Sequence, residues 1–146
     1  MSASALALAT CLVVGIADGD TLTALCQGNQ KVKVRLAEID APERKQPYGQ
    51  RSRQSLAEIC FQKRAVVQEQ SKDRYQRTLA RVTCDGVDAN AEQVRRGMAW
   101  VYDQYAKDKK LYAIQKDAQL AKRGLWAEKN PVPPWEWRKR MKQKNA

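Results

Sequence analysis

Three short runs of strand-forming residues, separated by two tight turns near the N-terminus, constrain the fold of this chain most. The first two runs, residues 11–17 and 21–26, flank Asp18-Gly19, and Asp-Gly is a strong signal for a β-hairpin. A second turn leads into residues 31–38, where apolar and charged side chains alternate as in a half-buried strand. The sequence therefore predicts three consecutive antiparallel strands, a meander.

The middle of the chain predicts helices and two further strands. Residues 51–63 carry apolar side chains at helical spacing, and strands are expected at 64–70 and 78–84. Helices are then predicted at 89–96 and 107–123, each followed by a glycine suited to a helix C-terminus. Five strands with one helix before the fourth follow the order of an OB-fold. The fold class expected is therefore α+β, with a five-stranded OB-fold β-barrel.

The two ends of the chain depart from this pattern. The segment "PVPPWEW" contains three prolines and is predicted to be extended, and the basic run after it to be solvated and partly disordered. Near the N-terminus, Ala7-Leu8-Ala9 has the form of a signal-peptide cleavage site, although no Lys or Arg precedes it. We therefore expect a signal-peptide remnant at 1–10, one barrel domain at 11–128 and a Pro- and Trp-containing basic tail at 129–146.

Composition narrows the chemistry that the chain can perform. It contains no histidine, which excludes His general bases, Ser-His and Cys-His pairs and His-ligated zinc. The net charge of +11 favours a polyanionic partner: nucleic acid, an anionic membrane or an acidic protein. The apolar run up to Ile16 is too short to span a membrane. Acid–base or metal chemistry must therefore use carboxylates, Lys, Tyr, Cys or backbone groups.

The chain has four cysteines and no Cys-x-x-Cys motif. Two disulfides in an oxidising compartment and four buried thiols in a cytosolic protein both fit this count. In the predicted fold, Cys11 and Cys26 could face each other across the first hairpin, and Cys60 and Cys84 could meet where the first helix packs on the barrel. We therefore predict the disulfides Cys11–Cys26 and Cys60–Cys84, which require short Cα separations.

Charged residues gather at the ends of the predicted strands. Asp20 lies at the first hairpin turn, Arg35 lies on the polar face of the third strand, and Asp40 and Glu43 lie just beyond its end. Two converging carboxylates with backbone carbonyls suit a hard cation, Ca²⁺ or Mg²⁺. A third acid could hold a water as general base, and arginines could clamp a phosphate. The alternatives are acids that only form turns and an ordinary arginine–carboxylate salt bridge.

Three motifs in this order, "DGDT", "RLAEIDAPE" and "DRYQR", resemble the staphylococcal nuclease (thermonuclease) family over residues 11–128. The resemblance implies an OB barrel with three α-helices and a Ca²⁺-dependent nuclease. Such an enzyme cleaves DNA and RNA on the 5′-oxygen side and leaves 3′-phosphates. The resemblance implies that Asp20, Asp40 and the Ala41 carbonyl bind the metal, with Asp18 and Thr21 behind them, and that Glu43 acts on the attacking water. It also implies that Arg35 and Arg77 bind the scissile phosphate and that Arg74 and Tyr75 bind a terminal phosphate.

Three departures from the family pattern are visible. Ala41 stands where the family often has Thr, and the loop after Glu43 is shorter than in the namesake. Gln76 stands where Gly is usual. If position 76 requires a positive φ, Gln strains the turn there and Arg77 is misaimed.

The resulting hypothesis is a secreted or periplasmic nuclease with Ca²⁺ as cofactor and DNA and RNA as substrates. A monomer is expected, without a stable protein partner and without a membrane span. Two alternatives remain open. One is a catalytically silent OB-fold module that binds nucleic acid or protein, and the other is a basic cell-envelope binding protein with an incidental acid cluster.

Overall fold

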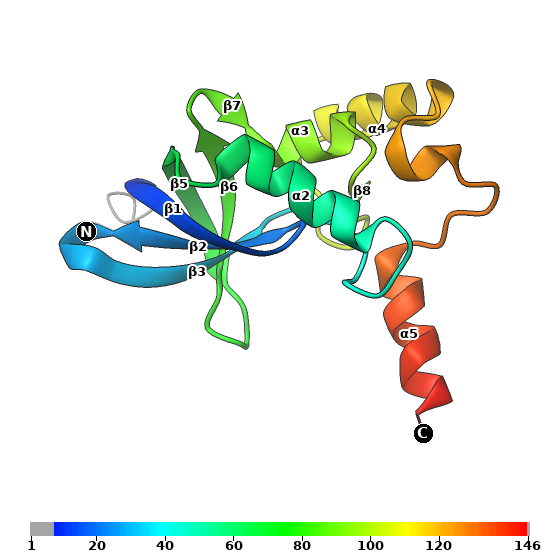
Figure 1. The fold of residues 1–146 in the computed structure, drawn as a ribbon, viewed down its shortest axis with the longest axis horizontal. Coiled ribbons are helices and arrows are strands. Elements are labelled where there is room, and N and C mark those ends of the chain that lie inside the picture. Colours follow the sequence, from blue (N-terminus) through cyan, green and yellow to red (C-terminus); the bar gives the residue numbers. More distant parts are fainter. Residues whose placement is uncertain (1–7, 146) are drawn as a thin grey trace.

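The computed structural model describes residues 8–145, and its scaffold is a strongly curved antiparallel sheet (Figure 1). The strand order is β3-β2-β1-β5-β6-β7, and β3 also pairs in parallel with β6, aligning Arg35 with Leu79. This extra pairing closes five strands into a barrel, which confirms the α+β, OB-type prediction. The strands are β1 (Leu8–Asp18), β2 (Thr21–Cys26), β3 (Gln30–Leu36), β5 (Arg64–Lys72), β6 (Thr78–Cys84) and β7 (Val87–Asp88), with a 3₁₀ turn at Gln27–Asn29 between β2 and β3.

A separate two-stranded sheet joins the end of the meander to the second half of the chain. It is formed by β4 (Ile39–Asp40) and β8 (Trp100–Val101), which run antiparallel. Ile39 is aligned with Val101, and Asp40 is aligned with Trp100. The backbone of Asp40 is therefore positioned by a segment some 60 residues further along the chain.

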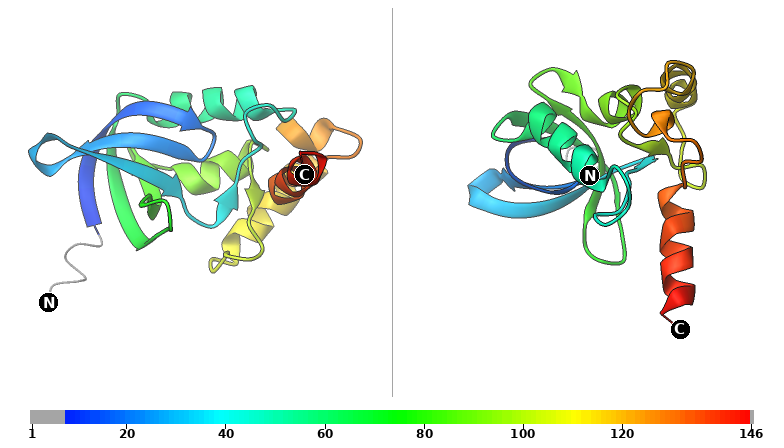
Figure 2. Two further views of the ribbon diagram at one scale, coloured as in Figure 1. Left: turned by 90° about the horizontal axis from the view of Figure 1, so that it is seen from below. Right: turned by 45° about the vertical axis from the view of Figure 1, so that its right-hand side comes forward.

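The described residues form four α-helices, one more than the resemblance implied. They are α2 (Gly49–Cys60), α3 (Ala89–Arg95), α4 (Lys110–Leu120) and α5 (Pro134–Lys144), and a 3₁₀ turn (Gly124–Ala127) follows α4. Helices α2, α3 and α4 correspond to the predicted helices. Figure 2 shows that α5 extends away from the rest of the molecule and carries the C-terminus at its far end.

Helix α5 corrects two expectations about the C-terminal segment. Extended backbone was expected up to Trp137, but it ends at Pro133, and helix begins at Pro134. Proline is tolerated in the first helical turn because its missing N–H has no intrahelical partner there. The basic run that was expected to be partly disordered is helical as far as Lys144.

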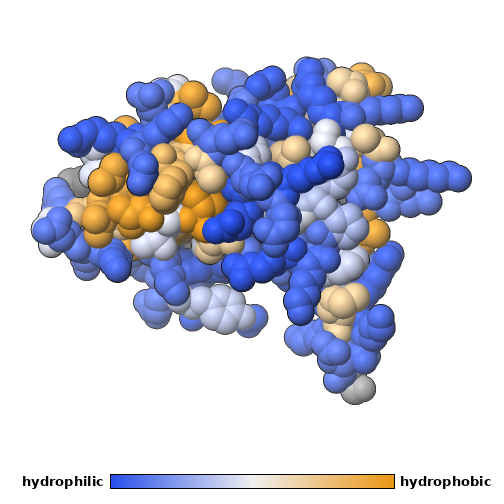
Figure 3. All heavy atoms as spheres, viewed as in Figure 1, coloured by the Kyte–Doolittle hydropathy of each residue, from blue (hydrophilic) through white to orange (hydrophobic). Residues whose placement is uncertain are grey.

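The core lies inside the barrel and beneath the helices that cover it. It includes the fully buried residues Val13, Leu22, Leu36, Leu56 and Val82. The strand alternation explains this burial, because every second side chain of β2, β3 and β6 points inward. Figure 3 shows apolar surface gathered over the barrel strands, whereas the helical side is mostly hydrophilic.

Both predicted disulfides are present. Cys11–Cys26 ties β1 to the end of β2 with a Cα separation of 4.4 Å, and Cys60–Cys84 ties the end of α2 to the end of β6 at 5.2 Å. Both predictions, the pairing across the first hairpin and the pairing between the first helix and the barrel, are therefore confirmed. Within residues 8–145, no helix is both long enough and apolar enough to cross a bilayer.

Candidate active site

Two aspartates converge on one arginine where the meander ends. The Arg35 guanidinium places Nη2 3.4 Å from Asp20 Oδ2 and 3.2 Å from Asp40 Oδ1. Its Nη1 donates to the backbone carbonyls of Leu36 and Ile39, which fixes the direction of the guanidinium plane. The structure thus brings together Asp20, Arg35 and Asp40, three of the residues identified from the sequence.

The register of the meander explains this convergence. Thr21 on β2 lies opposite Arg35 on β3, so Asp20, the residue just before β2, lies beside the guanidinium. The Asp20 carboxylate accepts hydrogen bonds from Thr21 Oγ1 at 3.0 Å and from the Ala41 backbone N–H at 2.9 Å. Thr21 and Ala41 therefore hold Asp20 in place, whatever further role each has.

Asp40 is the most deeply buried acid of the site, with a side chain that is 1% exposed. Burial raises the pKa of Asp40 to about 6, the hydrogen bond from Arg138 opposes this, and the neighbouring Asp20 carboxylate adds to the increase. At neutral pH two like charges therefore lie close together in a partly dry site. Such a pair requires cations as partners.

Glu43 lies at the rim of the same cluster, with a side chain that is 40% exposed. Its backbone N–H donates to the side-chain carbonyl of Gln46 at 3.0 Å, which orders the turn after Pro42. One Glu43 carboxylate oxygen lies 2.9 Å from Arg138 Nη1. Arg138 therefore bridges Glu43 and Asp40, and the Glu43 side chain is partly exposed to solvent.

Arg138 of α5 is the residue of this site that sequence reasoning missed. Its Nη2 donates to Asp40 Oδ2 at 2.8 Å and lies 3.3 Å from the Tyr102 hydroxyl. Its Nη1 donates to Asp40 Oδ1 at 3.1 Å as well as to Glu43. A signal was available: prolines ahead of a basic segment that contains Trp135 and Trp137 also fit an anchored helix.

The remaining predicted residues lie further from the acids. In the β5–β6 turn, Arg77 Nε donates to Asp73 Oδ2 at 2.7 Å, and its guanidinium lies 5.6 Å from the Tyr75 ring centre. Arg74 donates to the Tyr75 hydroxyl, and both are exposed. Asp18 pairs with Arg44 at 3.7 Å on the surface. The hydrogen bonds and ion pairs of Arg77 thus connect it to its own turn and not to Asp40 or Glu43.

Gln76 adopts a φ of +66°, so the turn does require the left-handed conformation that glycine adopts most easily. The Asp73 carboxylate accepts hydrogen bonds from the backbone N–H groups of Tyr75 and Arg77 and so stabilises this turn. The same carboxylate holds the Arg77 side chain. This bond uses the Nε donor, so the terminal Nη1 and Nη2 donors of Arg77 can bind another anion while the bond to Asp73 is kept.

The donor set around Asp20 and Asp40 fits a hard divalent cation. Two carboxylates lie within reach of a single guanidinium nitrogen, and each is already held by neighbouring donors. In the part of the chain described here, no cluster of three acidic or thiol side chains is close enough to hold an ion alone. Backbone oxygens and water would therefore complete the coordination, as is common for Ca²⁺ and Mg²⁺.

Glu38, another residue that the sequence did not single out, supports the turn between Arg35 and Asp40. It has a φ of +71°, and its side chain is 3% exposed. Its carboxylate accepts hydrogen bonds from the Lys107 and Asp108 backbone N–H groups at 2.6 and 2.8 Å. Burial acts to raise the pKa of Glu38, but the hydrogen bonds from Gln70 and from these two amides outweigh it and lower the pKa overall.

We predict that Glu38→Gln lowers the free energy of unfolding at pH 7 by about 2–4 kcal/mol, because charge-assisted hydrogen bonds to a buried carboxylate are lost. A lowered folded-state pKa contributes stability above the unfolded pKa, near 4.5, and loses it as pH falls through the folded value. Urea unfolding at pH 7 and pH 3 should therefore show a difference between the two proteins that shrinks in acid. An unchanged difference at pH 3 would contradict this assignment.

Comparison with known proteins places these residues in a family context. The family model described as "Staphylococcal nuclease homologue" matches residues 33–128. A protein of Haemophilus influenzae named "Uncharacterized endonuclease" is 50% identical over 133 residues, which cover 91% of this chain and 75% of that protein. An Escherichia coli O157:H7 protein of the same name is 43% identical, over 88% of this chain and 84% of that protein. A Shigella flexneri protein named "Micrococcal nuclease" is 41% identical, over 89% of this chain and 80% of that protein.

Proposed function

The chain belongs to the staphylococcal nuclease family, and from this we propose that it is a Ca²⁺-dependent nuclease that hydrolyses phosphodiester bonds of DNA and RNA. The observation that carries the proposal is the cluster at the end of β3. There Asp20 and Asp40 share the Arg35 guanidinium, and Glu43 lies at the open rim. The net charge of +11 suits a polyanionic substrate.

In the proposed reaction, Asp20, Asp40 and the Ala41 carbonyl hold the cation. Bound there, Ca²⁺ would supply positive charge next to a phosphate oxygen and so favour attack at phosphorus. Glu43 accepts a proton from the attacking water and directs the water at the phosphorus atom. The bond between phosphorus and the 5′-oxygen breaks, and the leaving 5′-oxygen takes up a proton from solvent. The products are a 3′-phosphate and a 5′-hydroxyl.

Arg35 and Arg77 are proposed to bind the oxygens of the scissile phosphate and to stabilise their growing charge. For Arg35 the supporting feature is the pair of carbonyls that orient its guanidinium towards the acids. For Arg77 it is position, because β6 begins one residue later and lies against the strand that carries Arg35. Arg74 and Tyr75, exposed at the same turn, are proposed to contact a terminal phosphate.

We further propose that the protein acts as a monomer in a secreted or periplasmic setting. The two disulfides support an oxidising compartment, because structural disulfides persist there and are rare in the cytosol. The disulfide Cys60–Cys84 also joins α2 to the barrel that carries the acids.

Cleavage of end-labelled single-stranded DNA and RNA by the purified protein, with Ca²⁺ and with chelator, tests the proposal. We expect cleavage only with Ca²⁺, and products whose 3′ ends become extendable by a polymerase only after phosphatase treatment. Binding of DNA without cleavage under any metal condition would instead support a silent OB-fold binding module. Affinity for anionic vesicles without DNA binding would support a cell-envelope protein.

A further inference from the structure

Arg138 occupies the centre of the acid cluster but has no part in the reaction described above. Of its hydrogen bonds, two join it to the Asp40 carboxylate, one to Glu43 and one to Tyr102. The first two partners are the acids to which the proposed function assigns the cation and the water. A fully charged arginine at this position must therefore act on whatever binds there.

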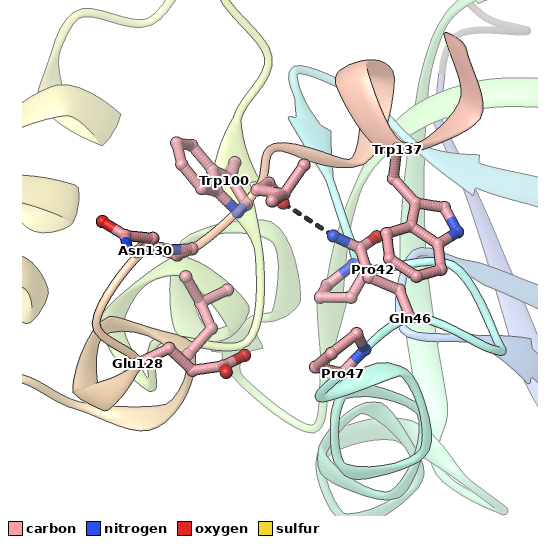
Figure 4. Close-up of a pocket in the computed structure, with 10 residues that line it drawn as sticks. Pro42, Gln46, Pro47, Trp100, Glu128, Asn130 and Trp137 are labelled. Carbon is pink, nitrogen blue, oxygen red and sulfur yellow. Dashed lines mark hydrogen bonds between the residues drawn. The ribbon is translucent and has the colours of Figure 1, made fainter. Parts of the chain in front are cut away.

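Contacts that do not involve Arg138 hold the helix that carries it. The Trp135 ring stacks on Tyr102, with centroids 5.3 Å apart and planes 3° apart, and meets Trp100 edge-on. Figure 4 shows the Gln46 side chain directed at the segment ahead of α5, where its Nε2 donates to the Val132 carbonyl at 2.6 Å. The start of α5 therefore remains docked if Arg138 exchanges its partners.

Gln46 also links this anchor to the acid cluster. Its side-chain oxygen accepts the Glu43 backbone N–H, while its nitrogen holds the segment that leads into α5. A small cavity of about 80 Å³ lies at this joint, lined by Pro42, Trp100 and Trp137 among others (Figure 4). Such a volume has room for a few water molecules and not for a nucleobase. This contact of Gln46 fixes the position of Arg138 in the absence of ligand, and the cavity beside it is not a ligand site.

The outer side of the Arg138 guanidinium is accessible. Its side chain is 39% exposed, whereas the Asp40 side chain beneath it is 1% exposed. Helix α5 has a single acid, Glu136. Beyond Arg138, its exposed cations are Lys139, Arg140, Lys142 and Lys144. A polyanion that approaches the acid cluster along α5 therefore meets Arg138 last, directly above Asp40.

We propose that Arg138 is a substrate-binding residue whose guanidinium exchanges the Asp40 carboxylate for a phosphate oxygen of the nucleic acid. The inference rests on the proposed nuclease function. Once Asp40 gives its oxygens to a cation, Arg138 loses two acceptors and keeps Glu43 at the rim. A phosphate then offers the planar guanidinium a new pair of acceptors at the same place.

The test is isothermal titration calorimetry with thymidine 3′-phosphate, which has the product end of the proposed reaction and no diester bond to cleave. With Ca²⁺, Arg138→Ala should weaken binding about tenfold, since a charge-assisted contact is lost. Arg138→Lys should recover part of the affinity for the nucleotide, because lysine keeps the positive charge but cannot donate two parallel hydrogen bonds to a phosphate. In chelator, wild type and Arg138→Ala should agree within about twofold, because Arg138 is then held by the acids.

Arg64→Ala is the matched control, since Arg64 is an exposed arginine at the start of β5 and belongs neither to α5 nor to the acid cluster. It should change affinity by less than about twofold. If Arg138→Ala binds the nucleotide in Ca²⁺ as tightly as wild type or more tightly, the proposal is overturned. Arg138 would then compete with the ligand for the acids. If the alanine variant does not fold, as judged by circular dichroism, Arg138→Lys decides alone, and binding equal to wild type overturns the proposal. Absence of DNA cleavage by wild type counts against the nuclease function, whereas the titration decides on Arg138.

Discussion

Replacing Glu43 with glutamine is expected to lower kcat on single-stranded DNA by a factor of about 10²–10⁴, the range for loss of a general base. Glutamine has nearly the same shape and can still accept the hydrogen bond that Arg138 donates to position 43. The change therefore removes the proton acceptor and leaves the neighbouring contacts. Initial rates at saturating Ca²⁺ and DNA measure the effect.

Glu58→Gln is the control for this experiment. Glu58 is a mostly exposed acid on α2 that pairs with Arg96, remote from the acid cluster. Its replacement also removes one negative charge from the chain, and the rate should stay within about twofold of wild type. Full activity of Glu43→Gln would remove Glu43 from the role of base and leave the aspartates to organise the water.

Removing the Cys60–Cys84 disulfide with a double alanine substitution is expected to lower the free energy of unfolding by about 3 kcal/mol. The bridge closes a loop of 24 residues and joins α2 to β6. Its loss therefore increases the conformational entropy of the unfolded chain. Both cysteines are fully buried, and alanine introduces no unsatisfied polar group. Urea unfolding of wild type and variant, each under oxidising conditions, measures the difference.

Reductant provides the internal check. Dithiothreitol should destabilise wild type more than the double variant, because only Cys11–Cys26 remains to be reduced in the variant. A loss below about 1 kcal/mol in the variant would mean that packing of α2 on the barrel suffices without the bridge.

The barrel and most of its acid cluster could be predicted because their causes are local in sequence. Alternation in β3 and the turn around Gly19 define the meander, and its register then places Asp20 beside Arg35. The register of β1 against β2 aligns Leu12 with Leu25 and so brings the neighbouring Cys11 and Cys26 together. The positive φ at Gln76 was recognised as a possibility because glycine is usual in the family at that position.

The contribution of α5 could not be predicted in this way. Its position depends on Trp135 stacking against Tyr102 and on Arg138 meeting an acid 98 residues earlier in the chain. The prolines and tryptophans of this segment fit an anchored helix, but a single sequence contains no signal for which acid Arg138 meets. The three prolines also predict an extended segment, although Pro134 occupies the helical turn in which proline is favourable.

Glu38 was missed for a related reason. In the sequence it is the last residue of the predicted strand 31–38 and resembles one more polar residue at a strand end. Its burial arises from two backbone amides at positions 107 and 108, which only the folded chain brings to it. Predictions from the sequence therefore fail where a site is completed by segments from the second half of the chain.

The placement of Asp40 has a consequence for behaviour on heating. Its backbone pairs with Trp100 in β8 and its carboxylate with Arg138 in α5, whereas the barrel is held by its own ladders and two disulfides. Undocking one segment costs less free energy than unfolding the whole chain. We therefore expect warming to disassemble the acid cluster while the barrel is still folded. Activity assays and circular dichroism at the same temperatures should show inactivation below the melting temperature of the barrel, reversed on cooling.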